Sequence, residues 1–523
     1  MRRLIVCCDG TWNSPKNKDG DLLAPTNVIK FHAEIAKEDA DGNEQIPFYR
    51  TGVGTLGNPL KKLLGGALGY KLEDDIKSAY KFLAETWKPG DEIYLLGFSR
   101  GAYTARSVAG LLGSIGLCNL TDPDLSDETK WANAHAALLR FQLKKSNGRS
   151  VLLNQEKRQG KDKITVDLHS PDQVPIRFLG VWDTVGSLGV PDDLGLTKLI
   201  IGDLRSNRFL DTKLGDGVQT ARHALAIDEQ RIDFVPTLWT GHDPGRDIRQ
   251  VWFAGVHGDV GGSYADHRLG DITLNWMIEE AFACGLAFRN GTQPSPPSLK
   301  CDPRGRIHDS VSGIFKHRVT RPRGLPSFTA GKDQLTEISK EAMQRHKQPA
   351  VGETDYWKTR RLSAVGDETE ISVHARERWN RSGLFVRAGE HYEVSARGEW
   401  RDAHIKASPN GAYNSIRLGY FLAGIPEGMR AGLRKIPRTR SADNRWSRRH
   451  AGARWFSLVG VVANGRGVSA GKSQLNRHQP EEIGEKGLLK PDDDGYLYFY
   501  ANDVWALYDN NSGALRVKIK RMK

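Results

Sequence analysis

Apolar runs alternate with longer, helix-compatible stretches through about the first 300 residues of the chain. Four of these runs are typical of buried strands: Leu4–Cys8, Glu92–Gly97, Ile176–Trp182 and Gln250–Val256. Each run is followed by a turn and then by a segment that can form a helix. This alternation predicts an α/β fold, with a mostly parallel sheet that carries helices on both faces.

The pattern changes after about residue 320. Within residues 326–380, the stretch Gln334–Arg361 is polar with a weak helical pattern, which is typical of a connecting segment. From residue 381 onward, short apolar runs are separated by Gly, Asn and Asp, as in "GYLYFYAND" and "GALRVKIKR". We therefore expect an α/β domain over residues 1–325, a connecting segment over 326–380 and a C-terminal β-sandwich over 381–523.

The charge of the chain indicates which classes of molecule it can bind. The formal net charge of +13 favours anionic surfaces, such as lipid headgroups or acidic glycans. No nucleic-acid-binding motif is present, so we expect no nucleic-acid partner. The arginine-rich residues 430–454, with Trp446 and Trp455, are typical either of a solvated loop or of a headgroup or glycan contact.

Five cysteines without a CxxC pair argue against a disulfide framework and a structural zinc site.

The N-terminus is basic and then apolar, as a signal peptide would be. The apolar stretch Leu4–Cys8 is shorter than the 7–15 residues that such a peptide needs, so a first strand is the better interpretation. The longest uncharged segment, Ser107–Thr121, falls short of the ~20 apolar residues that span a bilayer. We therefore expect a chain that is soluble when made, without a signal peptide, and that needs other machinery if it acts outside its cell.

The sequence "GFSRG" places Ser99 directly after the strand-like run that ends at Gly97. The small residues of "AYTARSVAGLLGSIG" then favour a helix. A strand, a sharp turn and a helix form the context in which a G-x-S-x-G motif holds a nucleophilic serine. We therefore expect Ser99 to be a nucleophile, with its Oγ exposed at the N-terminus of the helix.

A serine nucleophile needs a histidine and an acid, and in α/β-hydrolases both follow the serine in the chain. The acid usually comes two strands after the serine. Counted over the runs above, this position favours Asp259, with Asp183 as the alternative. His308 lies downstream of both aspartates and is the expected base. The alternative, His257, precedes Asp259 and fits only an acid at Asp183.

The oxyanion of the reaction also needs hydrogen-bond donors. The backbone N–H of Arg100, directly after the serine, is the first expected donor. The second should come from a loop near the serine, and the strand end "CCDGTWN" offers the N–H of Gly10 or Thr11. Asp9 in the same stretch could instead simply orient that loop.

Five blocks of this chain together resemble the α/β-hydrolase domain of bacterial type VI secretion phospholipase effectors. They are "CDGTWN", "GFSRGAYTAR", "GVWDTVGS", "VWFAGVHGDVGGSY" and "IHDSV", which occur in this order over about Arg2–Thr320. The resemblance implies a Ser-Asp-His hydrolase of lipid esters, commonly a phospholipase A. Ser99 carries over directly from the family's motif.

A second resemblance covers about Gly383–Lys523. The stretch "LYFYANDVWALYDNNSGALRV" resembles the calcium-binding end of small galactose-binding bacterial lectins. The resemblance implies that calcium is held by Asp503, the carbonyl of Leu507, Asn510 and Asn511, a set of oxygen ligands that calcium prefers. An Asx-rich turn without metal is the alternative. Another ligand of the family, a tyrosine carbonyl, aligns with Ala403, so the local loop differs.

We therefore expect a serine hydrolase of lipid acyl esters, a phospholipase A that acts as a secreted antibacterial effector. The resemblance implies that it is made in the bacterial cytoplasm without a signal peptide, is exported, and acts at the membrane or in the periplasm of a target cell. The hydrolase chemistry needs no cofactor. Expected partners are a phospholipid surface, a carbohydrate, the secretion machinery and an immunity protein. The alternatives are an esterase of soluble or glycan-linked acyl groups, and a calcium-dependent carbohydrate-binding protein whose hydrolase domain is inactive.

Overall fold

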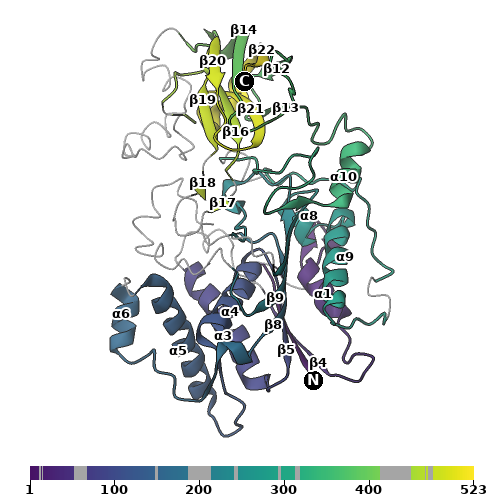
Figure 1. Cartoon of the computed structure of the whole chain (residues 1–523), viewed down its shortest axis with the longest axis vertical. Helices are drawn as coiled ribbons and strands as arrows, with labels where there is room; N and C mark the ends of the chain where they lie inside the picture. Colours follow the sequence, from purple (N-terminus) through teal and green to yellow (C-terminus); the bar gives the residue numbers. More distant parts are fainter. Residues whose placement is uncertain are drawn as a thin grey trace.

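The structure is a computed structural model of the 523-residue chain, shown in Figure 1. It describes all residues except 11–12, 14–15, 52–66, 148–150, 186–213, 241–244, 292–295, 313–318, 413–448, 451, 466, 469–474 and 477. Most of the arginine-rich stretch 430–454 therefore lies outside the described residues. The described part consists of a large helix-covered sheet and an antiparallel sandwich beyond one end of it.

The large sheet has seven strands, and every neighbouring pair is parallel. In spatial order the strands are β11 (Glu337–Ile338), β10 (Asp247–Phe253), β9 (Val218–Ala226), β8 (Ile176–Trp182), β5 (Glu92–Phe98), β1 (Arg3–Cys8) and β4 (Gln45–Arg50). The strand order reverses once, between β1 and β5, because the chain goes from β1 outward to β4 before returning to β5. In open α/β sheets, ligands bind outside the carboxyl ends of the strands at such a reversal.

The central strands are apolar along their whole length because both faces of the sheet are covered. In β1, the side chains of Leu4, Val6 and Cys8 enter one hydrophobic core, whereas Ile5 and Cys7 enter the other. The first core lies under α3 (Ala67–Thr86), α4 (Arg100–Ile115) and α5 (Asp127–Ser146), and the second under α1 (Asn27–Glu34) and α9 (Arg268–Ala283). Figure 1 shows these two groups of helices on opposite sides of the sheet.

Short elements complete this unit. They are the helices α6 (Val151–Arg158), α8 (His257–Gly261) and α10 (Lys340–Lys347), and the strand pairs β2 (Lys18–Asp19) with β3 (Leu22–Leu23) and β6 (Leu117–Cys118) with β7 (Leu168–His169). In the part of the chain that the structure describes, no helix is long and apolar enough to cross a bilayer.

All four predicted strands of the large sheet are present as β1, β5, β8 and β10, and the predicted α/β class is confirmed. The sequence analysis missed β9, which lies between β8 and β10. Its sequence "VQTARHALA" places Arg222 and His223 in a strand, and both are buried because distant side chains and the sheet surround them. The count that favoured Asp259 was therefore wrong: Asp259 follows the third strand after the serine, not the second.

The C-terminal unit is a sandwich of two antiparallel sheets, as predicted. One sheet contains β12 (Glu368–His374), β22 (Asn511–Arg521), β14 (Tyr392–Asp402), β15 (Ile405–Ala407) and β20 (Lys486–Leu489). The other contains β13 (Asn380–Val386), β21 (Gly495–Ala501), β16 (Leu458–Ala463) and β19 (Gln479–Glu482). The strands β17 (Gly467–Val468) and β18 (Leu475–Asn476) form a separate two-stranded sheet. Side chains from both sheets form one core, which includes Trp400, Phe499 and Val517.

The two units share a continuous apolar contact. Tyr496 and Tyr498 of β21 belong to the same buried cluster as Trp252 of β10 and Phe328. Across this contact, Tyr356 Oη and Trp357 Nε1 donate hydrogen bonds of 2.8 and 2.9 Å to Asp228, which follows β9. The sandwich is thus fixed against the edge of the sheet at which the strands end.

The segment over residues 326–380, expected to connect the two units, contributes to both. It supplies β11 to the parallel sheet and β12 to the sandwich, and α10 packs against β10. Strands of two residues such as β11 leave little periodic signal in a sequence, which is why this part did not stand out.

Candidate active site

Ser99 lies in the turn between β5 and α4, at φ 57° and ψ −119°. Positive φ is rare for a residue with a Cβ atom, and such conformations gather at functional sites. The Ser99 N–H donates a 3.0 Å hydrogen bond to the carbonyl of Trp182 at the end of β8, which holds the turn against the neighbouring strand. The predicted strand, turn and helix around Ser99 are confirmed.

The glycines two positions before and two positions after Ser99 permit this turn, because the backbone of α4 lies very close to the strands there. A Cβ atom on Gly97 would lie 2.3 Å from the carbonyl oxygen of Gly101. One on Gly101 would lie 2.1 Å from the carbonyl oxygen of Cys8 in β1. The helix therefore starts directly on the sheet, and no larger residue fits at either position without displacing backbone.

The strand end after β1 lies beside the serine, since a Cβ atom on Gly10 would lie 3.2 Å from Ser99 Cβ. The Gly10 N–H, however, already donates a 2.7 Å hydrogen bond to the Asp9 carboxylate. Asp9 also accepts from Thr26 Oγ1 and Tyr49 Oη, and burial raises its pKa. Asp9 thus orients this loop. Thr11, the other expected oxyanion donor here, lies outside the described residues.

Asp259 and His308 form a close pair. Asp259 lies on α8, which follows β10, and its Oδ1 is 2.6 Å from His308 Nδ1. Its Oδ2 accepts hydrogen bonds from the N–H groups of His308 and Val256, at 3.2 and 2.9 Å. The Tyr264 ring stacks on the His308 ring at 3.8 Å between centroids. The imidazole is therefore fixed on one edge and on one face.

The alternative residues, Asp183 and His257, also form a pair, with Asp183 Oδ2 at 2.6 Å from His257 Nδ1. Asp183 directly follows β8, has a φ of 39° and is completely buried. The Arg323 guanidinium bonds to both of its oxygens, at 2.6 and 2.9 Å. Sequence reasoning missed Arg323, which lies 140 positions away in a Pro- and Arg-rich stretch.

The two pairs differ in charge. Although burial raises the pKa of Asp183, the charge of Arg323 and the bonds from His257 and Arg323 hold it well below the usual range. Burial also lowers the pKa of His257 despite the neighbouring carboxylate. Asp259, by contrast, has no cation pair other than His308 among the described residues. His308 is thus the only ion-pair partner of Asp259 among the described residues, whereas the Asp183 carboxylate also balances the charge of the buried Arg323.

Both pairs are connected to the serine through Phe98, the residue before it. The His257 ring lies 4.6 Å from the Phe98 ring, and a Cβ atom on Gly261 would lie 2.1 Å from that ring. Helix α8 therefore packs directly on the residue that precedes Ser99. Within the described residues, no hydrogen bond joins Ser99 Oγ to His308 or His257. Catalytic hydrogen bonds are often long before the substrate binds.

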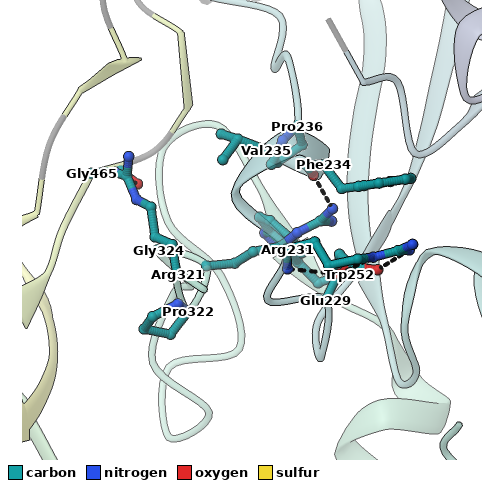
Figure 2. Close-up of a pocket in the computed structure, with 11 residues that line it drawn as sticks. Glu229, Arg231, Phe234, Val235, Pro236, Trp252, Arg321, Pro322, Gly324 and Gly465 are labelled. Atoms are coloured by element: carbon teal, nitrogen blue, oxygen red, sulfur yellow. Dashed lines mark hydrogen bonds and ion pairs between the residues drawn. The ribbon is translucent and has the colours of Figure 1, made fainter. Parts of the chain in front are cut away.

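Glu229 is a further residue that the sequence did not reveal. It is 1% exposed and accepts hydrogen bonds from the His257 N–H at 3.3 Å and from Ser310 Oγ at 3.0 Å. Its ion pair with Arg231, at 2.7 Å, is visible in Figure 2, where Phe234 lies next to Arg231 in the wall of a small hollow. Glu229 thus ties the segment of His257 to the segment of His308. It follows β9, the strand that sequence reasoning missed.

The four predicted calcium ligands lie at one end of the sandwich. Asp503 and Asn511 are buried, and Asn511 Nδ2 donates a 2.9 Å hydrogen bond to Asp503 Oδ2. Asn510 Nδ2 donates to Asp402 Oδ1 at 2.9 Å, and Leu507 lies between Asp503 and Asn510 in a 3₁₀ turn. The structure thus brings Asp503, Asn510 and Asn511 together and adds Asp402, which was not predicted.

Comparison with known proteins bears on the α/β unit. Residues 2–280, more than half of the chain, match the family described as the catalytic domain of type VI secretion system (T6SS), Tle1-like phospholipase effectors. The chain belongs to this family. The matched region of this Tle1-like chain contains Ser99, Asp183, His257 and Asp259, and it ends before His308.

Three individual proteins are similar to parts of this Tle1-like chain. An uncharacterised protein of Saccharomyces cerevisiae, YEL023C, is 28% identical over 254 residues, which is 46% of this chain and 33% of the yeast protein. The Tle1 effector bound to the VgrG spike of the type 6 secretion system is 18% identical over 50% of this chain and 51% of its own, with a TM-score of 0.30. The PllA-like lectin domain at the N-terminus of EclA is 17% identical over 29% of this chain and 94% of its own, with a TM-score of 0.18.

Proposed function

We propose that this chain hydrolyses carboxylic acyl esters of phospholipids, as a phospholipase A, with Ser99 as nucleophile, His308 as general base and Asp259 as the acid that orients the histidine. The family supports a lipid-directed hydrolase. The observation that carries the assignment is the 2.6 Å pair of His308 with a carboxylate that bears no other cation among the described residues. This pair lies at the same sheet edge as the turn that holds Ser99.

In this reaction Ser99 Oγ attacks the ester carbonyl carbon while His308 Nε2 takes its proton. Asp259 stabilises the imidazolium that forms and keeps Nδ1 protonated toward it. The oxyanion accepts a hydrogen bond from the backbone N–H of Arg100, in the first turn of α4. His308 then protonates the departing lysophospholipid oxygen, and a water activated by His308 releases the fatty acid from Ser99.

Vesicles of phosphatidylethanolamine and phosphatidylglycerol test this proposal. The full chain should release free fatty acid and lysophospholipid, and Ser99→Ala should lower the rate by at least a thousandfold because the acyl-enzyme cannot form. Ser372→Ala, at an exposed position on β12, is the control and should leave the rate unchanged. Equal release by wild type and Ser99→Ala would overturn the proposal. Activity confined to short soluble esters would favour an esterase of soluble acyl groups instead.

We also propose that the sandwich binds calcium, because the residues present fit a divalent cation. Burial and the charge of Asp402 raise the pKa of Asp503 to about 7, so a buried carboxylate lies here beside another acid. Asn511 Oδ1 is buried and has no hydrogen-bond partner among the described residues. Asp503, Asn510, Asn511 and the carbonyl of Leu507 would hold the ion, which would neutralise the carboxylates and offer coordination positions to sugar hydroxyls.

Calcium chloride should raise the thermal midpoint of the wild-type chain, since an ion that binds only the folded state stabilises it. Asp503→Asn should abolish this rise, whereas Asp509→Asn, at an exposed position in the same turn, should keep it. A rise that persists in Asp503→Asn would contradict the assignment.

We propose further that the chain is delivered by a type VI secretion system to a target-cell membrane. Membership of the effector family supports this route, and the similar Tle1 effector is described as bound to a VgrG spike. The expected carbohydrate ligand and immunity protein remain predictions. Co-purification of the full chain with a VgrG spike of its own genome tests the delivery route, and failure of every such spike to retain the chain would contradict it.

A further inference from the structure

A cavity of about 340 Å³ lies between the α/β unit and the sandwich. The α/β unit contributes Asp228, Asp309 and Thr320 to its wall, and the sandwich contributes Arg376, Arg378 and Arg381. A hydrogen bond of 3.0 Å from Trp379 Nε1 to Thr320 Oγ1 crosses its border and fixes the two walls against each other. Its volume is that of a pocket for a small ligand or for part of a larger one.

The cavity is adjacent to the candidate active site. Asp309, in its wall, directly follows His308 in the chain, and Val311 of the same segment also lines it. Ser310 between them is held by Glu229, the residue that also binds the His257 backbone. A ligand in the cavity would therefore lie next to the segment that carries the general base.

The wall from the sandwich is cationic. Its three arginines occur within six residues, in the connection between β12 and β13 and at the start of β13. The Arg381 guanidinium lies 4.0 Å from the centroid of the Trp357 ring, a cation–π contact that limits its freedom. Arg376 is exposed and has no ion pair among the described residues. Guanidinium groups arranged in this way bind phosphate oxygens well.

Arg378 is more enclosed than its neighbours. Burial lowers the pKa of its guanidinium, and the positive charge of Arg449 lowers it further. The Asp509 carboxylate acts in the opposite direction and raises it. The cation is therefore partly desolvated before any ligand binds. An anion in the cavity would stabilise its charged form.

The acids in the wall limit the charge of the ligand. Asp309 and Glu377 are exposed carboxylates beside the three arginines. Asp228 is half-buried, desolvation raises its pKa, and it accepts hydrogen bonds from Tyr356 and Trp357. Arg323 and Asp228 also line the cavity, so its wall has four arginines against three carboxylates, an excess of one positive charge. This balance suits the single negative charge of a phosphodiester better than the double charge of a phosphate monoester.

We propose that this cavity is the headgroup subsite of the enzyme, in which Arg376, Arg378 and Arg381 bind the phosphodiester of a glycerophospholipid whose acyl ester lies at Ser99. The inference rests on the proposed function for its substrate, and it adds that the sandwich supplies specificity to the active site. The enzyme then selects phospholipids over neutral glycerides that carry the same acyl chains.

Hydrolysis by the full chain gives the first test. The double variant Arg376→Gln/Arg381→Gln, at two exposed positions, should lower kcat/KM on phosphatidylethanolamine and phosphatidylglycerol by about tenfold per arginine. Its rate on diacylglycerol with the same acyl chains should stay within twofold. Arg397→Gln, an exposed arginine on β14 of the same sandwich, is the matched control and should change neither rate. An equal loss on phospholipid and diacylglycerol, or no loss on either, would overturn the subsite.

Binding to the inactive full chain gives the second test and separates the subsite from the proposed hydrolysis. In Ser99→Ala, calorimetry with glycerophosphoethanolamine, a soluble phosphodiester, should show binding that the two arginine substitutions weaken by at least tenfold. Inorganic phosphate should bind more weakly than the diester. Arginine-dependent diester binding, together with no phospholipid hydrolysis by the wild-type chain, would keep the subsite and reject the proposed function. Binding that the arginine substitutions do not weaken, or a preference for inorganic phosphate, would reject the subsite.

Discussion

Two aspartate–histidine pairs lie at the carboxyl edge of the sheet, and the groups around each carboxylate distinguish their roles. Asp259 accepts only from two backbone N–H groups and His308 among the described residues. Asp183 compensates Arg323, a cation that is almost completely buried. In the proposed mechanism the first pair transfers the proton, whereas the second holds β8, β9 and the segment of Arg323 together.

Substituting each aspartate should separate these roles. Asp259→Asn should lower kcat by roughly a thousandfold to ten-thousandfold, because the amide cannot stabilise the imidazolium, and should leave the thermal midpoint almost unchanged. Asp183→Asn should destabilise the fold by about 3–5 kcal/mol, since a buried guanidinium loses its counter-charge. Steady-state kinetics on phospholipid vesicles and thermal unfolding check both. A stable, inactive Asp183→Asn beside an active Asp259→Asn would reverse the assignment.

At this scale the sequence predicted the residues that motifs mark, and the structure pairs two of them, Asp259 and His308. Ser99, Asp259 and His308 lie in short blocks whose spacing follows the order of α/β-hydrolases. Arg323 and Glu229 could not be predicted, because their roles depend on contacts with residues far away in the chain. Nothing in the local sequence of either residue indicates those partners.

At the scale of elements, α4 positions the serine by starting directly on the sheet. Gly97 and Gly101 leave no space for a side chain between the helix and β1 or β5. The strands β1, β5 and β8 were predictable because each is a continuous apolar run that is buried on both faces. In β9, buried Arg222 bonds to Asp247 and Glu280, so long-range ion pairs replace the apolar signal.

Two glycines of the same helix provide a matched comparison. Gly101→Ala should displace α4 from β1 and destabilise the fold by about 1–3 kcal/mol or more, because its Cβ atom would lie 2.1 Å from the Cys8 carbonyl oxygen. Gly113→Ala has open space around its Cβ atom and should be neutral or stabilising by up to roughly 1 kcal/mol. Thermal midpoints and vesicle hydrolysis measure both. A tolerated Gly101→Ala would contradict the close approach.

At the scale of the whole molecule, the sandwich and the α/β unit share one buried apolar cluster. His478 lies in their contact: its Nδ1 accepts from the Gly465 N–H at 3.0 Å, and its Nε2 is 2.7 Å from the carbonyl oxygen of Pro322. Burial lowers the pKa of His478 well below its usual value, and the charge of Arg321 lowers it further. The contact therefore requires the neutral imidazole.

This requirement predicts an acid-sensitive contact. A histidine with a lowered pKa in the folded state binds fewer protons there than in the unfolded state, so its stabilising contribution is complete above about pH 6.5 and decreases as the pH falls. The thermal midpoint of the full chain should fall between pH 7.5 and 5. His478→Gln should reduce that fall, whereas His374→Gln, at an exposed position on β12, should not. Identical pH dependence in wild type and His478→Gln would refute this role.

The arrangement of the two units could not be predicted from sequence. The alternation of apolar and polar residues indicated the sandwich itself. Its contact with the parallel sheet depends on Tyr496, Tyr498 and Phe328, but aromatic residues of this kind are equally typical of the core within a single domain. The placement of three arginines beside the segment of His308 follows from that contact. The proposed specificity for phospholipids is therefore a property of the whole molecule.

The most direct test of the central claim is to label the full chain with a fluorophosphonate, which reacts with activated serines, and to map the adduct by peptide mass spectrometry. The account predicts one adduct, on Ser99, and a labelling rate that falls at least a hundredfold in His308→Ala and in Asp259→Asn. An adduct on another serine, such as Ser263 or Ser310, or a Ser99 adduct whose rate is unchanged without His308, would contradict it.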